Sequence, residues 1–323
     1  MRIPNPLRTI NLVLNFHSIP SSDWFRNSLY TIEKIYKFIS IKEIESYFYN
    51  DTNFNNCCHI CFDDGDQSVY KHAFPVLQEM NIPATLFVSP KIICDESNYW
   101  FQELSYIQNY LGDTIVKERI CEIFHCQYEQ IKTYTTLNLF RCMKLKEIFQ
   151  VINTIKKEYE IIINKKYNLT KDQLLELNDS NLITFGAHTM NHPILANETN
   201  NDSEKEIHES IEKLSELLET DIKYFAYPNG KTGLDFTKRE QKMLYENKIK
   251  LGLSTDAGFF NKDTNPFVIP RSGYFTDFKM EKSLYEMGKI IVLPIRDIIL
   301  NMVNIEIKER YERKKIRNLG IFK

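Results

Sequence analysis

Residues 58–68 read CHICFDDGDQS, a short apolar run that leads straight into two adjacent aspartates and a glycine. The run has the length and composition of a buried strand. In barrels and doubly wound sheets, reactive groups gather at the carboxyl ends of the strands. The residues that end this strand, Asp63 and Asp64, therefore have to be compared with those that end the other predicted strands.

Six further apolar runs rich in Val, Ile, Phe and Thr have the length of strands, and segments with helical spacing lie between most of them. This alternation predicts an α/β fold with a parallel sheet that is closed or nearly closed. Seven strands instead of eight imply an irregular (β/α)7-type barrel. The predicted strands are residues 10–17, 57–63, 84–89, 182–188, 223–228, 250–255 and 267–271, and the main helical segments are 27–47, 67–80, 203–219 and 235–247.

Residues 97–177 interrupt the alternation, because they offer mainly helical material before the next strand. We expect a helical insertion over the barrel mouth, between the third and fourth strands of a single domain of residues 1–323. Residues 278–323 predict a long helix around Pro294 and a strongly basic tail. The tail fits either a solvated, frayed terminus or a peripheral contact with anionic lipid at the inner face of a membrane.

The composition of the 323 residues is that of an ordinary globular protein, with 43% hydrophobic and 26% charged residues. Its 41 basic and 43 acidic residues give a net charge of -2, so we expect no nucleic-acid partner. Seven cysteines at irregular spacing indicate reduced thiols instead of a disulfide framework. Because neither a secretion-signal pattern nor a membrane-spanning apolar run occurs, we expect a cytoplasmic location.

The predicted strand ends carry side chains suited to metal binding and proton transfer. Two histidines four residues apart, as in HTMNH, can converge on one metal ion. A carboxylate from a neighbouring strand end would complete a set of ligands that leaves one position open for water. The rim collects two carboxylates, three imidazoles and a guanidinium, from Asp63, Asp64, His17, His188, His192 and Arg271.

The two aspartates can divide the chemistry, because successive side chains of a strand point to opposite sides. One would bind the ion while the other faces the bound water as a base. Taken alone, Asp63 and Asp64 fit a turn that caps the next helix, and His188 and His192 fit two solvated or hydrogen-bonded histidines. Their joint occurrence at strand ends of one alternating pattern favours the metal site.

FDDG at the end of one strand and HTMNH after a later one resemble motifs of the polysaccharide deacetylase family, the NodB-homology enzymes of carbohydrate esterase family 4. The resemblance extends from about residue 10 to residue 275, apart from the helical insertion. It implies an irregular (β/α) barrel and a divalent ion, usually Zn²⁺, with Co²⁺, Ni²⁺ or Mn²⁺ as alternatives. The pattern looks most similar to members with a strand-end histidine near the N-terminus, such as the poly-N-acetylglucosamine deacetylases.

Carried over residue by residue, the resemblance implies that Asp63 is the general base and that Asp64, His188 and His192 hold the metal. The reaction would then be attack of a metal-activated water on an amide carbonyl. Its products would be acetate and a free amino sugar.

FAYPNG matches the aromatic-proline motif that forms one wall of the family's groove. The resemblance implies that Pro228 lies at the substrate and that the backbone N–H of Tyr227 stabilises the oxyanion. The chain departs from the family at Phe225, where an arginine often orients the catalytic aspartate, and we expect Arg271 to replace it. The late histidine that serves many members as general acid is also absent, and His17, in LNFHSIP, is the predicted acid.

These features predict a metal-dependent hydrolase that removes an N-acetyl group from a glycan, oligosaccharide or lipid-linked saccharide. The same resemblance leaves open a deformylase or another C–N amide hydrolase. A non-catalytic carbohydrate-binding protein that kept the barrel is the alternative from a different functional class.

Overall fold

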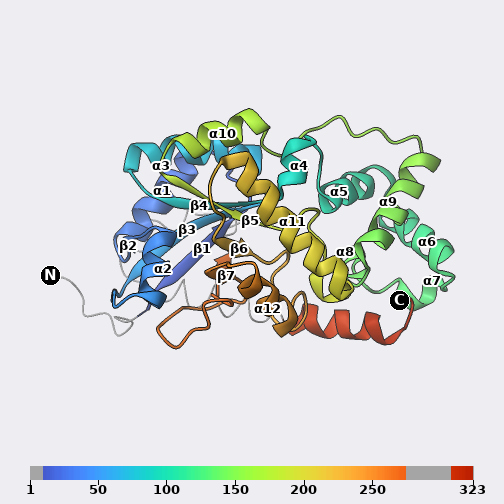
Figure 1. Ribbon diagram of the computed structural model, residues 1–323. Coiled ribbons are helices and arrows are strands. Elements are labelled where there is room, and N and C mark those ends of the chain that lie inside the picture. The colour runs from blue at the N-terminus through green and yellow to red at the C-terminus, as the bar shows by residue number, and fades with distance from the viewer. Residues whose placement is uncertain (1–9, 274–306, 323) are drawn as a thin grey trace.

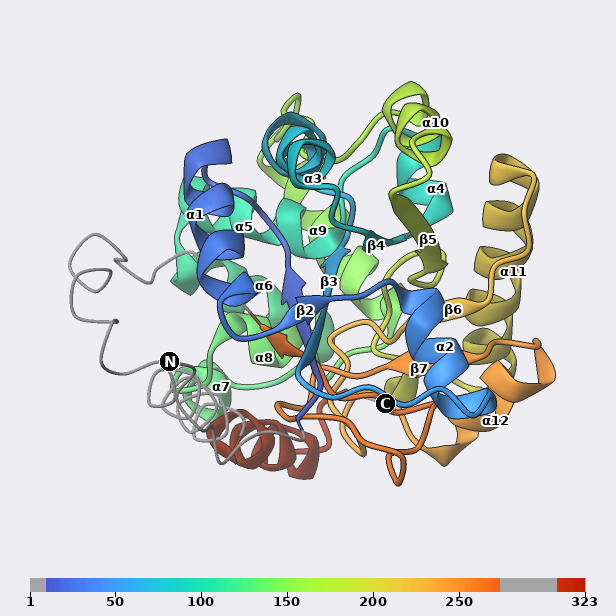
Figure 2. The ribbon, with the colours of Figure 1, turned by 90° about the vertical axis from the view of Figure 1, so that its left-hand side faces the viewer.

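The structure is a computed structural model that describes residues 10–273 and 307–322. Its centre is a curled sheet with the strand order β7-β6-β5-β4-β3-β1-β8, and β2 pairs with β3 beside this path (Figures 1 and 2). Every pairing between these strands is parallel. The strands are β1 (Leu12–Phe16), β2 (Lys37–Phe38), β3 (Cys57–Asp63), β4 (Ala84–Val88), β5 (Ile183–Ala187), β6 (Tyr224–Ala226), β7 (Leu251–Leu253) and β8 (Ser272–Gly273).

The last strand segment brings the two edges of the sheet together. Ile269 forms a parallel bridge with Leu253 of β7, and Ser272 pairs with Leu14 of β1. Residues 269–273 therefore touch both edges, which gives the irregular closure that the strand count predicted. The predicted final strand, residues 267–271, lies just before β8, because the pairing with β1 begins only at Ser272.

Helices surround the sheet, as the alternation predicted (Figure 2). The predicted single helix over 27–47 is wrong, because β2 separates two helices there. Ser40 starts the second of these with a capping box, in which its side chain accepts from the Glu43 N–H. The helices of this layer are α1 (Ser22–Glu33), α2 (Ile41–Tyr49), α3 (Phe74–Met80), α4 (Pro90–Cys94), α10 (Lys171–Asp179), α11 (Asn200–Leu218) and α12 (Lys238–Glu246).

Five helices lie between α4 and α10 and form a lobe at one end of the sheet (Figure 1). They have a hydrophobic core of their own, which includes Trp100, Phe140 and Ile152. Ile316, from the far end of the chain, is buried in the same core. The helices are α5 (Trp100–Leu111), α6 (Asp113–Phe124), α7 (Tyr128–Ile131), α8 (Thr136–Phe140) and α9 (Leu145–Glu158).

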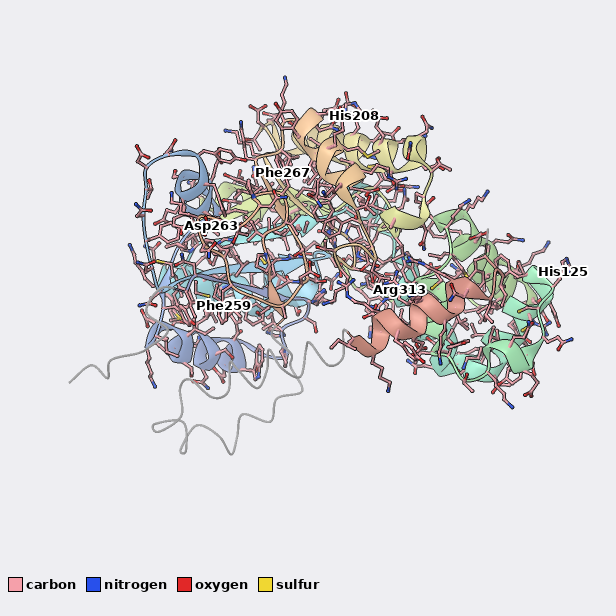
Figure 3. The ribbon with its side chains drawn as sticks, turned by 90° about the horizontal axis from the view of Figure 1, so that it is seen from below. His125, His208, Phe259, Asp263, Phe267 and Arg313 are labelled. Carbon is pink, nitrogen blue, oxygen red and sulfur yellow. The ribbon has the colours of Figure 1, made fainter. Side chains whose placement is uncertain are left out.

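The C-terminal helix, residues 307–318, packs along this lobe (Figure 3). Arg313 is fully buried, pairs with the equally buried Asp235 at 2.6 Å, and donates to the Arg141 carbonyl at 3.0 Å. The frayed terminus considered for the basic tail is therefore wrong, because a buried ion pair fixes this helix. The helix expected around Pro294 lies outside the described residues.

Among residues 10–273 and 307–322, no helix combines the length and the apolar character needed to cross a bilayer.

Arg313→Met should destabilise the protein by about 3–5 kcal/mol, because it leaves the Asp235 carboxylate buried without its cation. Lys314→Met, at an exposed position of the same helix, should change stability by less than ~0.5 kcal/mol. Urea unfolding of both variants measures the difference. Equal midpoints for the two variants would contradict the anchoring role of Arg313.

Candidate active site

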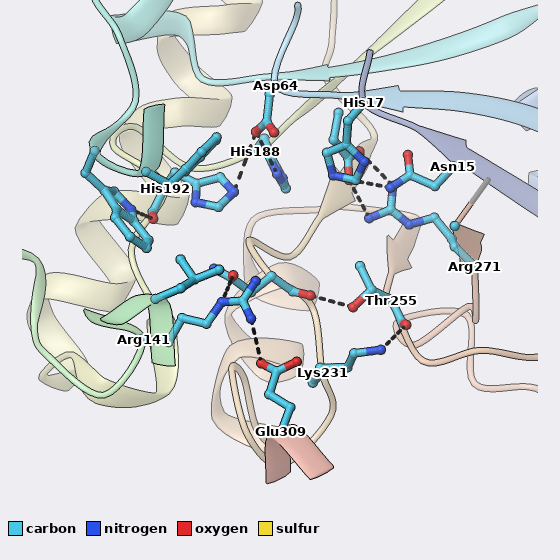
Figure 4. A pocket seen from close by; sticks show the side chains of 16 residues that line it. Asn15, His17, Asp64, Arg141, His188, His192, Lys231, Thr255, Arg271 and Glu309 are labelled. Atoms are coloured by element: carbon cyan, nitrogen blue, oxygen red, sulfur yellow. Dashed lines mark hydrogen bonds and ion pairs between the residues drawn. The ribbon is translucent and has the colours of Figure 1, made fainter. Parts of the chain in front are cut away.

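The carboxyl ends of β1, β3 and β5 open into one pocket, which the lobe and the C-terminal helix close from the other side (Figure 4). Its volume of about 370 Å³ lies within the range of small-ligand pockets, roughly 300–1,000 Å³. Asp63, Asp64, His17, His188, His192 and Arg271 all line it. The fold thus gathers at one pocket the side chains that the comparison of strand ends had grouped.

Asp63 ends β3 and is held on both carboxylate oxygens. The Arg271 guanidinium donates to Oδ1 at 2.7 Å and to Oδ2 at 2.9 Å, and Asn15 Nδ2 donates to Oδ2 at 2.9 Å. This two-point geometry is the strong form of an arginine–carboxylate pair. The family often has an arginine at the position of Phe225, which here is buried within β6. In this chain it is Arg271 that contacts the aspartate.

The charge of Asp63 is stabilised although the group is buried. Burial alone would raise the pKa of Asp63, but the Arg271 guanidinium and the nearby histidines together outweigh it and hold that pKa well below its usual range. The same pair raises the pKa of Arg271 against the opposing effect of burial. Asp63 is therefore an oriented carboxylate at neutral pH.

Asp64, His188 and His192 converge from two loops. The Nε2 atoms of both histidines lie 3.6 Å from Asp64 Oδ1, and the three potential ligand atoms lie within 4.8 Å of one another. Asp64 Oδ1 is buried and has no hydrogen-bond partner among the described residues. A buried carboxylate oxygen is costly to leave unpaired, so this set of one oxygen and two nitrogens fits a divalent cation such as Zn²⁺.

Local backbone geometry aims these side chains. Asp64, Thr189 and His192 all have left-handed φ angles, of 67°, 63° and 57°. Such conformations cost free energy in residues other than glycine and occur preferentially at functional sites. They turn the chain immediately after β3 and β5, so that Asp64 faces the histidines while Asp63 faces Arg271.

Hydrogen bonds orient the two histidines. His188 Nδ1 lies 2.7 Å from the Ala226 carbonyl, which requires the proton on Nδ1 and leaves the Nε2 lone pair for a ligand role. The main chain of His192 is held at both ends: its N–H donates to Thr189 Oγ1, and its carbonyl accepts from the Trp100 indole. Trp100, from the helical lobe, is therefore packed against the site and fixes a loop of it.

The pKa values of this cluster favour neutral groups until a cation binds. Burial lowers the pKa of His188 to about 4. The pKa of His192 lies well below its usual range, mainly because the group is buried and secondly because His188 is nearby. Burial and the Asp63 charge raise the pKa of Asp64 well above its usual range. Neutral imidazoles are the form that binds metal, and a bound cation would reverse the effect on Asp64.

His17 follows β1 and lines the same pocket, from which it is accessible. The surrounding protein lowers its pKa by desolvation, whereas the charge of Asp63 acts to raise it. The structure thus places the predicted acid on the Asp63 side of the pocket, as Figure 4 shows for His17 and Arg271.

The prediction for Tyr227 is wrong. Its backbone N–H donates to the Leu253 carbonyl at 3.1 Å, as part of the contact between neighbouring strands. Its ring stacks on Phe236 at a centroid distance of 3.6 Å, and its hydroxyl donates to the Phe267 carbonyl. Neither Tyr227 nor Pro228 is among the residues that line the pocket. The contacts of Tyr227 instead hold neighbouring segments of the fold together.

Several lining residues were missed by the sequence comparison. Asn15 donates to Asp63 from within an otherwise apolar strand. A polar residue at such a position is the feature of the sequence that could have indicated this contact. Arg141 and Glu309 reach the pocket from the lobe and from the C-terminal helix. No strand end marks them, because their positions depend on how these helices pack.

The fold occurs in solved deacetylase structures. The chain aligns with IcaB from Ammonifex degensii at a TM-score of 0.56 and 20% identity, over 83% of this chain and 93% of that one. It aligns with the Streptococcus pyogenes deacetylase PplD in complex with acetate at 0.55 and 17%, over 88% and 99%. The BpsB deacetylase domain from Bordetella bronchiseptica aligns at 0.52 and 15%, over 84% and 98%.

No curated protein matches the chain in sequence. The family model for polysaccharide deacetylases does match it, over residues 51–114 and 127–247. These segments include the FDDG and HTMNH motifs and make up more than half of the 323 residues. The chain therefore belongs to the polysaccharide deacetylase family.

Proposed function

We propose that this protein is a metal-dependent hydrolase that removes the N-acetyl group from an N-acetylated saccharide and releases acetate. The observation that carries the proposal is that two groups of residues line the same pocket. One is the Asp64, His188 and His192 cluster with its unpartnered buried oxygen, and the other is the Asp63 carboxylate held by Arg271.

Asp64, His188 and His192 would hold the divalent ion, with Zn²⁺ as the first choice for two imidazoles and one carboxylate. When bound, such an ion polarises the acyl carbonyl and lowers the pKa of a water molecule. Three protein ligands would leave the ion accessible from the pocket, as in catalytic zinc sites.

Asp63 would take the proton from the attacking water. Arg271 favours the ionised carboxylate, and Arg271 and Asn15 together fix its direction, so that the base needs no reorientation during the reaction. A base that was only buried would be protonated at neutral pH, and the guanidinium prevents this.

His17 would deliver a proton to the leaving nitrogen. An amine is a poor leaving group unless it is protonated as the C–N bond breaks, and an imidazole is the usual donor near neutral pH. His17 lines the pocket together with Asp63, so both groups would face an amide bound there.

The saccharide substrate is supported by family membership and by the pocket. The IcaB, PplD and BpsB structures share the fold, and PplD and BpsB are deacetylases. The pocket is lined by apolar and hydrogen-bonding side chains, which suits a sugar with an acylamino group.

Protein stripped with a chelator should release no acetate from N-acetylglucosamine oligomers, and added Zn²⁺ or Co²⁺ should restore release. The reason is that the cluster supplies ligands but no electrophile of its own. Acetate is measured directly. Metal binding without acetate release from any saccharide would contradict the proposed reaction.

Asp63→Asn should retain the metal but lose about 10²–10⁴-fold in turnover, the usual contribution of a general base. Asp64→Ala should lose both metal and activity, because it removes one of three ligands. Metal content by elemental analysis separates the two. Near-normal turnover of Asp63→Asn would show that another group is the base.

Arg271→Lys should move the acid limb of the pH–rate profile to higher pH. Arg271 holds the pKa of Asp63 below its usual range, and lysine keeps the charge but loses the two-point contact, so the base becomes protonated at higher pH. The profile of kcat/KM, with Arg26→Lys at the surface as control, tests this. An unshifted acid limb would mean that Arg271 does not set the ionisation of Asp63.

A further inference from the structure

The wall of the pocket opposite the metal-binding cluster is built from three segments that lie far apart in the sequence. Arg141 follows α8 of the helical lobe, Asn229 follows β6, and Glu309 belongs to the C-terminal helix. Figure 4 shows Arg141 and Glu309 across the pocket from Asp64 and His17. Glu309 lies outside the residues that match the family model.

The Arg141 guanidinium is fixed at two of its three nitrogens. Nε donates to Asn229 Oδ1 at 3.0 Å, and Nη1 donates to Glu309 Oε1 at 3.0 Å. Glu309 is itself held, because Arg313 of the same helix also donates to its Oε1. Because guanidinium is planar, two fixed nitrogens determine the direction of the third.

Nη2, the third nitrogen, has no partner among the described residues. The side chain is 24% exposed and lines the pocket, so its remaining N–H groups are accessible from there. A fixed donor with accessible N–H groups is suited to binding a ligand, since little conformational entropy remains to be lost.

The charge of Arg141 is balanced within the protein. Arg141 and Arg313 face Glu309 and Asp235, which gives two cations and two carboxylates in one connected group. A neutral oxygen can therefore accept from Arg141 without leaving an unmatched charge. Hydroxyl, ring and acyl oxygens of a saccharide are such acceptors.

We infer that Arg141 is a substrate-binding residue, whose Nη2 donates to an oxygen of the saccharide on the side away from the metal-binding cluster. This inference rests on the proposed function, because it assumes a saccharide in this pocket. Asn229 and Glu309 are then positioning residues that act through Arg141. The C-terminal helix thereby takes part in substrate binding.

The test measures binding separately from turnover. Zinc-loaded Asp63→Asn protein serves as the parent, and calorimetry measures its affinity for a tetramer of N-acetylglucosamine. Adding Arg141→Lys should weaken binding about 10-fold or more, the effect of losing a hydrogen bond from a charged donor, with metal content and unfolding temperature unchanged. Adding Glu309→Ala, which keeps Arg141 but removes one of its two contacts, should weaken binding about threefold.

Arg26→Lys, at a surface ion pair on α1, is the matched control and should leave the affinity unchanged. A folded, metal-loaded Arg141→Lys protein that binds the tetramer within about twofold of the parent would overturn the inference. So would unchanged binding in Glu309→Ala, loss of metal together with binding, or a parent that binds no tetramer. Binding that depends on Arg141, in a protein whose wild type releases no acetate, would reject the proposed function and retain this site.

Discussion

The buried pair of Arg271 and Asp63 is the interaction on which the site depends. Arg271 lies at the segment that closes the sheet, between the Ile269 bridge to β7 and the pairing of β8 with β1. Its guanidinium crosses to the end of β3 and takes both oxygens of Asp63. The segment that closes the barrel therefore also orients Asp63, the proposed base. Removing either partner would leave a charge buried without compensation, which is far more costly than losing a surface ion pair.

The second constraint is that the protein alone does not satisfy the hydrogen-bonding capacity of the cluster of Asp64, His188 and His192 among the described residues. Burial disfavours the charge of Asp64, and its Oδ1 finds no donor within the described residues. The chain nevertheless turns through three left-handed residues to bring these groups together. Strain and desolvation of this kind are retained where a ligand offsets them. The two adjacent aspartates thus differ: Asp63 is paired with an arginine, whereas Asp64 Oδ1 has no hydrogen-bond partner among the described residues, which fits a site for a cation.

Much of this arrangement could be predicted from the sequence, and the reasons are local. The FDDG and HTMNH segments follow directly after strands, and in a parallel sheet such positions meet at one edge. Arg271 was predicted by the same rule. The error at Tyr227 arose because a motif specifies neighbouring residues but not which backbone N–H groups the sheet itself uses, and here the ladder with β7 takes that donor. Arg141 and Glu309 were missed because helix packing, which leaves no short sequence pattern, brings them to the pocket.

The contacts of the pocket also differ in how much of the chain they span. His188 and His192 are four residues apart, whereas the contact between Asp63 and Arg271 spans 208 residues and that between Arg141 and Glu309 spans 168. The entropic cost of closing a loop grows with its length, so contacts between distant residues form late in folding. The site should therefore form in stages. The loop with His188 and His192 would form early, whereas the contacts of Arg271 with Asp63 and of Glu309 with Arg141 would form when the last parts of the chain pack against the rest. A folding intermediate in which β3, β4 and β5 are paired would bring Asp64 to the two histidines before Arg271 and Glu309 are in place. The residues proposed to bind metal would then assemble before those proposed to orient the base and bind the substrate.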